Sequence, residues 1–378
     1  MSSIPALTGI RALAAGAVFF GHILHKHIDQ SLPFLEYGWI GVNMFFALSG
    51  YLFFILYVNA LENNTFSWRT YLAKRFIRIY PLTILIVLIS WIAMNFTHDI
   101  MDVLSHLALI HGVFPQYRFS INPPLWTLTI EMSFYLIAPL LIFSMSALYS
   151  GWKSKLGVEK DTSRYVIASI TILIWMISVA FCNGMSEIYQ NWWYFFTGTW
   201  DPEVGTQTIF GKLDDFMAGM AIAAYVRLFP EKKHLSGDII VMIGTAIIIL
   251  ALMFTSSQGG SNLVGKHKLA DFVFPSLAFG SGLIIMGLHR GGFIAKLLST
   301  KTMVLLGEIS FGLYVLHYIS IPGYPKSAVS LQYHLESLGL HFIIAAIICY
   351  ITYSLLAFLS LIYFEKPIGR YLTKRLIR

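Results

Sequence analysis

The chain has 378 residues, of which 57% are hydrophobic and 12% are charged, whereas an average soluble domain is about 25% charged. This composition excludes an ordinary soluble enzyme, because the apolar residues form blocks of roughly 20 residues, long enough to cross a bilayer. The net charge of +7 would suit a nucleic-acid-binding protein, but basic residues in membrane proteins mark cytoplasmic loops. No nucleic-acid partner is expected.

Ten apolar blocks are predicted to be transmembrane helices, so the expected fold class is an all-α integral membrane protein. In chain order they are 7–27, 37–58, 77–97, 124–148, 164–183, 207–229, 238–255, 271–289, 303–321 and 339–364. No repeat or long hydrophilic stretch divides the chain, which predicts a single domain over 1–378.

One further apolar stretch, 100–115, is short and contains Asp102, His106 and His111. Its length and polarity favour a re-entrant or interfacial helix over a span. The longest polar connections are 184–206 and 322–337, and both are predicted to lie outside. The first is rich in aromatic residues that form either an interfacial belt or a platform for stacking sugars; they are Trp192, Trp193, Tyr194 and Trp200.

The positions of lysine and arginine predict the orientation. With a cytoplasmic N-terminus and a stretch 100–115 that does not cross, twenty of the 26 basic residues lie inside. These are Arg11, Arg69, Lys74, Arg75, Arg78, Lys153, Lys155, Lys160, Arg164, Arg227, Lys232, Lys233, Arg290, Lys296, Lys301, Lys366, Arg370, Lys374, Arg375 and Arg378; Lys26, Arg118, Lys212, Lys266, Lys268 and Lys326 lie outside. This excess of inner positive charge predicts that both termini are cytoplasmic.

Titratable side chains at membrane depth are costly and point to function. His22 follows Arg11 by eleven positions on one apolar helix, which is about 16 Å along its axis. If Arg11 lies at the inner boundary, His22 lies near the middle of the bilayer. His22 is therefore either a catalytic group or a packed histidine that bonds to a neighbouring helix.

Glu131 lies about two turns inside the span 124–148, whose start is set by Pro123 and Pro124. A buried carboxylate needs a partner, for which a histidine or an arginine is expected. Glu131 is then either half of a structural pair or part of an active site.

Arg75 and Arg78 lie three residues apart on one helical face, just before Tyr80 and Pro81. The guanidinium fork binds phosphate oxygens through two hydrogen bonds, so this pair suits a phosphorylated cytosolic ligand. The alternative is that both arginines only anchor the helix at the inner surface.

Weaker candidates are pairs of titratable residues on one predicted helix: Asp214 with Asp215, Glu308 with His317, and Asp102 with His106. Two such ligands without a third or fourth make a poor metal site, so no metal is expected. Ser49 and Gly50 lack the strand-to-helix setting of a hydrolase nucleophile, and their small size instead favours close helix contact.

Taken together, the order and spacing of these motifs resemble acyltransferase family 3 of membrane proteins over essentially the whole chain. The segments that carry the resemblance are Leu7–Ala14 followed by His22, Phe45–Leu52, Arg75–Pro81, Trp126–Glu131, Leu306–His317 and Glu365–Pro367. The chain departs from the family pattern at Asn43, where aspartate is frequent, and at Thr127, where serine is usual.

The resemblance implies an enzyme that moves an acyl group, most often acetyl, from cytosolic acyl-CoA to a hydroxyl of an extracytoplasmic or lipid-linked glycan, such as an O-antigen. It also implies a multi-pass protein of the bacterial inner membrane, in contact with membrane lipid and with acyl-CoA as its co-substrate. His22 would be the base or the acyl carrier and Glu131 would set its tautomer, while Arg11, Arg75 and Arg78 would hold the CoA phosphates. Further site candidates are Asn43, Ser49, Tyr80, Trp126 and His317.

The main alternative is a glycolipid or small-anion transporter, in which the same residues would form a proton relay and an anion gate. Paired interrupted helices in two halves are typical of transporters, and the sequence does not show them. A sensor or scaffold would leave the clustered motifs without a role.

Overall fold

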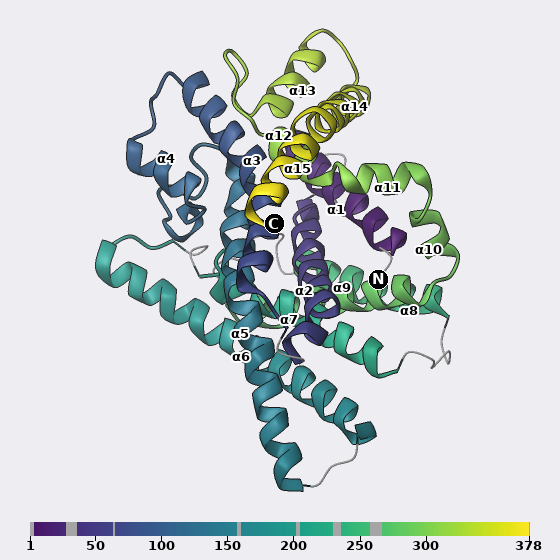
Figure 1. Cartoon of the computed structure of the whole chain (residues 1–378). Helices are drawn as coiled ribbons and strands as arrows, with labels where there is room; N and C mark the ends of the chain where they lie inside the picture. The colour runs from purple at the N-terminus through teal and green to yellow at the C-terminus, as the bar shows by residue number, and fades with distance from the viewer. Residues whose placement is uncertain are drawn as a thin grey trace. The chain divides into compact units, whose positions relative to one another are not determined.

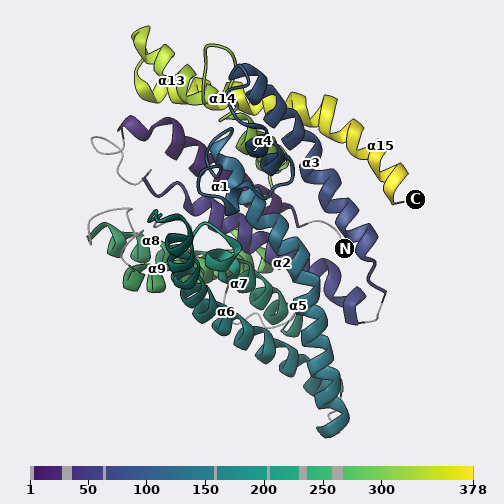
Figure 2. The same ribbon diagram turned by 90° about the vertical axis from the view of Figure 1, so that its left-hand side faces the viewer.

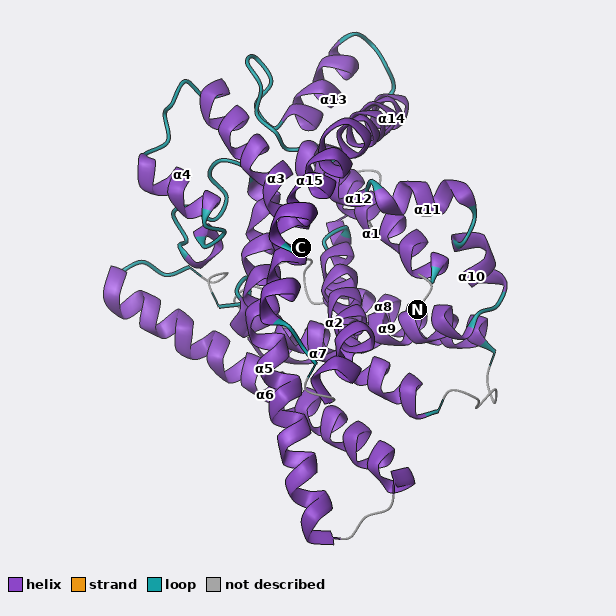
Figure 3. Ribbon diagram, in the orientation of Figure 1, coloured by secondary structure: helices purple, strands orange, loops and turns teal. Residues whose placement is uncertain are grey.

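The computed structural model describes residues 4–27, 36–62, 65–156, 160–201, 205–229, 236–257 and 267–377. Lys232, Lys233, Lys266 and Arg378 of the charge pattern lie outside these ranges. Within them the elements are helices, joined by loops that hold one isolated bridge between Ile321 and Tyr324 (Figure 3). The predicted all-α class is confirmed for the described part of the chain.

Eight of the described helices are long and apolar enough to cross a membrane. They begin with α1 (Pro5–Ile23), α2 (Ile40–Glu62), α3 (Trp68–Ala93) and α5 (Trp126–Leu156), and continue with α6 (Lys160–Thr197), α8 (Gly237–Ser257), α9 (His267–Arg290) and α14 (Phe342–Ser360). These helices support a multi-pass membrane protein. The number of ten spans and the cytoplasmic location of both termini stay predictions.

Two predicted spans are absent from that set for different reasons. α7 (Ile209–Leu228) is a helix, but its two aspartates, Lys212 and Arg227 make it less apolar than a typical span. The prediction of one helix over 303–321 is wrong, because α11 (Lys301–Glu308) ends before α12 (Ser310–Leu316) begins. At the break the Ser310 hydroxyl donates to the Gly307 carbonyl at 2.8 Å, which satisfies an acceptor at the end of α11.

Much of the two segments predicted as long polar connections, 184–206 and 322–337, is helical in the structure. α6 continues to Thr197, and α13 (Ser327–Ser337) fills most of 322–337. The stretch 100–115 is short, as predicted, with α4 (Ile100–Leu107) followed by one 3-10 turn at His111–Val113. The remaining helical segments are the 3-10 turns His25–His27 and Pro123–Leu125, α10 (Phe293–Leu298), the π-helical turn Leu361–Glu365 and α15 (Lys366–Leu376).

The chain forms two compact units, each assembled from separated stretches. The first unit comprises Met1–Leu7, Asn43–Phe66 and Ile130–Ser299, and the second comprises Thr8–Val42, Ser67–Thr129 and Thr300–Arg378. In the first unit, α7 packs between α6 and α9, and α8 packs on α9. In the second unit, α12 and α13 pack on α14, and α15 lies along α3 (Figures 1 and 2). The single domain over 1–378 stays a prediction.

Small residues bring α2 and α7 of the first unit into direct backbone contact. A Cβ atom on Gly219 would lie 1.9 Å from the carbonyl oxygen of Ala47, and one on Gly50 would lie 2.0 Å from that of Phe216. The close helix contact expected at Gly50 is therefore confirmed, and no larger side chain fits at either position without moving a backbone.

A buried carboxylate organises the segment around α4 in the second unit. Asp102 is 3% exposed and accepts hydrogen bonds from His98 at 2.7 Å, His106 at 3.1 Å and Ser120 at 2.7 Å. Burial alone would raise the pKa of Asp102, but the hydrogen bonds from His106 and Ser120 lower it below its ordinary value. The predicted pairing of Asp102 with His106 is confirmed.

The ring of His111 stacks on that of His106, with 3.8 Å between the ring centres. Burial in the first place, and the charge of His106 in the second, hold the pKa of His111 well below its ordinary value. His111 is thus neutral in the folded protein at neutral pH.

Gly219→Ala is expected to lower the midpoint of thermal unfolding in detergent. The clash with Ala47 should cost about 1–3 kcal/mol, more than the ~1 kcal/mol gained by replacing a helical glycine. The matched control is Gly184→Ala on α6, because a Cβ at Gly184 meets nothing within 4 Å. Equal midpoints in the two variants would contradict the close contact.

His111→Phe is expected to weaken the acid sensitivity of folding. In the wild type the unfolded chain takes up a proton at His111 as the pH falls below about 6.5, while the folded chain does not, so stability is lost in that range. The unfolding midpoint, measured between pH 7.5 and 5, should therefore fall less in His111→Phe than in the wild type. His334→Phe, which replaces an exposed histidine, serves as control and should keep the wild-type slope.

Candidate active site

Two histidines that are far apart in the sequence meet in the second unit. His22 lies near the end of α1, and His317 directly follows α12. Nδ1 of His22 is 2.9 Å from Nε2 of His317, and the rings stack with their centres 5.2 Å apart. His317 is 1% exposed. The structure thus pairs two of the predicted site residues. It also agrees with the alternative prediction for His22, that of a histidine that bonds to a neighbouring helix.

The hydrogen bonds of this pair determine which ring nitrogen of His22 carries a proton and which does not. Nδ1 of His317 lies 3.1 Å from the carbonyl oxygen of Leu313. Because a carbonyl only accepts, this Nδ1 carries a proton, and Nε2 of the neutral His317 ring must accept from Nδ1–H of His22. Nε2 of neutral His22 is then unprotonated, as a general base or nucleophile requires.

Aromatic rings hold the pair in place. The ring centre of Tyr318 lies 4.9 Å from that of His22, and Phe19 lies 5.6 Å from His317. Near the other end of α1, a Cβ on Gly307 would lie 1.9 Å from the carbonyl oxygen of Thr8. The glycine therefore allows α11 to touch α1, which fixes the position of the broken helix relative to His22.

Glu131 has a different environment from the one expected. It lies on α5 in the first unit, where it accepts hydrogen bonds from the Ser49 hydroxyl at 3.0 Å and from the Tyr135 hydroxyl. Its partners among the described residues are thus two hydroxyls, whereas a histidine or an arginine was the expected partner. His317, rather than Glu131, bonds to Nδ1 of His22. His22 and Glu131 belong to different units, and their joint action stays a prediction.

Asn43 pairs with one of the weaker candidates, Asp215. Its amide nitrogen lies 2.9 Å from both carboxylate oxygens, and Lys212 lies 3.9 Å from one of them. Asn43 and Asp215 are both 1% exposed. An amide therefore supplies donors to a buried carboxylate at the position where the family often has aspartate, and the pair joins α2 to α7.

The start of α5 is tied to α12 by side chains that sequence reasoning largely missed. The hydroxyls of Thr127 and Tyr314 are 3.0 Å apart, and both also bond to the carbonyl of Pro124. Asn122 donates to the carbonyl of Val315 at 3.0 Å. Thr127 thus provides a hydrogen-bonding hydroxyl at the position where the family usually has serine. Trp126, the first residue of α5, is half-buried beside this junction.

The arginine pair lies on α3 with different surroundings for its two members. Arg75 is 9% exposed, and its guanidinium carbon lies 5.4 Å from the ring centre of Tyr71, a cation–π contact. Arg78 is exposed, and its charge acts on Glu365. Tyr80 stacks on Phe76 with 4.4 Å between the ring centres. Arg11 is half-buried on α1, eleven residues before His22.

α15 adds a second set of cations next to that pair. It lies along α3 (Figure 2), and a Cβ on Gly369 would be 3.6 Å from the side chain of Ile77. Its basic residues are all exposed: Lys366, Arg370, Lys374 and Arg375. Three of them, Lys366, Arg370 and Lys374, follow one another at intervals of four residues, so they lie along one face of α15, a pattern that is visible in the sequence.

Among the described residues, no three histidine, cysteine, aspartate or glutamate side chains are grouped so that they could hold a metal ion.

Comparison with known proteins connects this site to one family. A family model described as an acyltransferase domain, acyltransferase family 3, matches residues 4–364. The peptidoglycan O-acetyltransferase OatA of Listeria monocytogenes is 25% identical over 344 residues, which are 83% of this chain and 49% of that protein. The O-acetyltransferase OatA of Staphylococcus aureus is 23% identical over 338 residues, 83% of this chain and 50% of that protein.

The chain spans about half the length of these curated relatives. No solved structure matches it. The family model covers nearly the whole chain, including every segment that carries the resemblance in sequence except Glu365–Pro367, which lies just beyond its end. The chain therefore belongs to acyltransferase family 3.

Proposed function

We propose that this protein is a membrane O-acetyltransferase of the bacterial inner membrane. It moves an acetyl group from cytosolic acetyl-CoA to a hydroxyl of an extracytoplasmic or lipid-linked glycan. The observation that carries the proposal is the hydrogen-bond chain from His22 through His317 to the Leu313 carbonyl, which leaves Nε2 of His22 unprotonated. The name of the Listeria relative makes peptidoglycan the first acceptor to test.

In the direct route, Nε2 of His22 takes the proton of the acceptor hydroxyl while its oxygen attacks the thioester carbonyl carbon. The carbon–sulfur bond then breaks, and the CoA thiolate takes the proton from His22. His317 accepts the Nδ1–H bond throughout, which keeps His22 in the reactive tautomer and disperses the charge of the imidazolium. In a second route, Nε2 attacks the thioester carbonyl carbon and the carbon–sulfur bond breaks, which releases CoA thiolate. The acceptor oxygen then attacks the acetyl group on the ring, the bond from the acetyl group to Nε2 breaks, and the hydroxyl proton passes to the CoA thiolate.

The donor would be held by the cations of α3 and α15. CoA carries a diphosphate and a 3′-phosphate, and arginine and lysine bind such groups through charge-assisted hydrogen bonds. Arg75 and Arg78 stand on one helix, with the four exposed cations of α15 along the other. The concentration of like charge on two packed helices favours a polyanionic ligand over simple anchoring.

A glycolipid or small-anion transporter is the rival proposal. The broken helix formed by α11 and α12 beside His317 is a feature that transporters share. The family assignment favours the enzyme. Thiol release from acetyl-CoA by the purified protein separates the two, since a transporter would exchange its substrate without cleaving a thioester.

His22→Ala is expected to abolish thiol release, and His317→Leu to lower kcat about 10²–10⁴-fold, because the wrong tautomer of His22 then becomes accessible. His317→Gln should recover part of that loss, since its amide oxygen still accepts from His22 Nδ1–H. His25→Ala, an exposed histidine just after α1, is the control and should stay active. Equal loss in His317→Gln and His317→Leu at equal thermal stability would contradict the tautomer role.

Arg370→Gln and Lys374→Gln are each expected to raise KM for acetyl-CoA about tenfold without lowering kcat, the effect of one lost charge-assisted hydrogen bond. Acetyl-dephospho-CoA lacks the 3′-phosphate and therefore shows whether Arg370 or Lys374 contacts that group. If one of these residues contacts it, the variant of that residue and the wild type should have the same KM for acetyl-dephospho-CoA. Lys301→Gln, an exposed lysine on α11, is the control. An unchanged KM for acetyl-CoA in both α15 variants would remove α15 from the donor site.

A further inference from the structure

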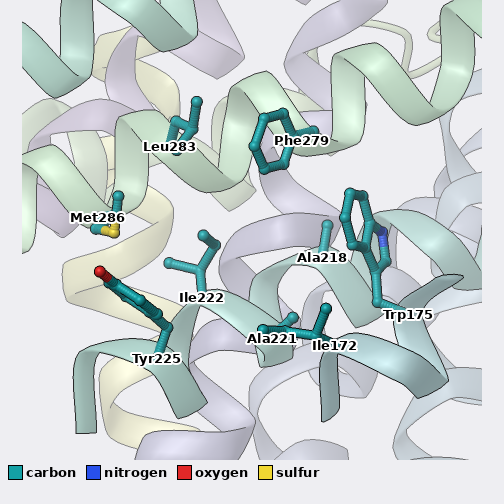
Figure 4. Close-up of a pocket in the computed structure, with 9 residues that line it drawn as sticks. All are labelled: Ile172, Trp175, Ala218, Ala221, Ile222, Tyr225, Phe279, Leu283 and Met286. Carbon is teal, nitrogen blue, oxygen red and sulfur yellow. The ribbon is translucent and has the colours of Figure 1, made fainter. Parts of the chain in front are cut away.

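The first unit contains an apolar cavity that the acyl-transfer proposal does not use. Its volume is about 230 Å³, and it lies between α6, α7 and α9 (Figure 4). The residues that line it are Ile172 and Trp175 of α6, Ala218, Ala221, Ile222 and Tyr225 of α7, and Phe279, Leu283 and Met286 of α9. The two alanines on α7 leave the space that larger side chains would fill.

The cavity has an aromatic end and an end with a polar group. Trp175 and Phe279 stack at one end with 5.5 Å between their ring centres. Tyr225 and Met286 lie at the other end (Figure 4). A cavity of this size with an apolar lining holds no stable water, because water needs two to four polar partners. Its chemistry fits a hydrocarbon chain.

The cavity is partly open, and α6, which contributes Ile172 and Trp175 to its lining, also carries exposed apolar residues next to them in the sequence. Leu173, Met176 and Ile177 of α6 are each 50% or more exposed. On a membrane helix such a surface faces lipid tails. The hydrocarbon that can reach the cavity from this surface is therefore a lipid chain, and its entry would restore the dispersion contacts that an empty cavity lacks.

A cation stands at the polar end. The guanidinium carbon of Arg290, the last residue of α9, lies 6.0 Å from the ring centre of Tyr225. The charge distribution predicts that this end of α9 is cytoplasmic. Arg227 on α7 is also near this end in sequence, but it donates to Asn59 at 2.8 Å. Arg290 is thus the cation that the structure places at the tyrosine that lines the cavity.

We propose that the cavity is a binding site for an anionic phospholipid, with one acyl chain between α6, α7 and α9 and the phosphate beside Arg290. A chain in an apolar slot together with a guanidinium at its polar end is complementary to such a lipid. The site is independent of acyl transfer, so a failure of either proposal leaves the other in place.

The test measures the lipid that full-length protein retains after delipidation in detergent, by native mass spectrometry with added phosphatidylglycerol or phosphatidylcholine. Wild type should retain one phosphatidylglycerol in preference to phosphatidylcholine.

Two pairs of variants separate the cavity from the headgroup site. Ala221→Phe, which fills the cavity, should lose the retained lipid, whereas Leu173→Phe on the neighbouring exposed surface should keep it. Arg290→Gln should lower the preference for phosphatidylglycerol about fivefold, the effect of one basic side chain on an anionic headgroup. Lys296→Gln, an exposed lysine outside the cavity, should not.

A second measurement does not depend on the filled variant folding. Phosphatidylglycerol with brominated acyl chains should quench the fluorescence of wild type more than that of Trp175→Phe, because Trp175 lines the cavity. Equal quenching of the two proteins, or equal retention of both lipids by wild type, would overturn the proposal. Displacement of the lipid by palmitoyl-CoA but not by excess phosphatidylglycerol would also overturn it, because the occupant would then be the chain of an acyl donor.

Discussion

The need to satisfy buried polar groups inside the protein is the constraint on which this architecture depends, since the hydrocarbon of a bilayer offers no hydrogen bonds. In the first unit Asn43 and Asp215 meet this need together and thereby join α2 to α7. In the second unit the hydroxyls of Thr127 and Tyr314 join the start of α5 to α12. Removing either member of such a pair leaves the other unsatisfied, so each pair fixes the register of two helices.

The same constraint governs the chemistry proposed for His22. The break between α11 and α12 lets the chain restart as a short helix that ends at His317. One nitrogen of His317 satisfies a backbone carbonyl one turn earlier, and the other faces His22. A hydrogen bond that serves the backbone therefore also selects the tautomer of the neighbouring ring. In the proposed mechanism, one contact between His22 and His317 therefore serves both the structure and the reaction.

On the surface, apolar side chains and cations are separated from each other. Large apolar side chains are exposed along α6, α8 and α14, while exposed cations gather on α3 and α15. This segregation is what a bilayer requires. Both proposed ligands depend on local features of that surface. One is a second row of cations beside the arginine pair, and the other is an apolar cavity with Arg290 at its polar end.

The sequence by itself determined the helical class and most helix positions, because runs of apolar residues are a local property. Residues 238–255 and 271–289, for example, lie inside α8 and α9. It also identified His22, Glu131, Arg75 and His317 as candidates, since polar groups at membrane depth are costly wherever they lie. Only the tertiary structure decided their partners. His22 and His317 are 295 positions apart, and Glu131 bonds to Ser49 and Tyr135. Which donors and acceptors meet depends on helix packing and on the break at Ile309, and neither is encoded in a local apolar pattern.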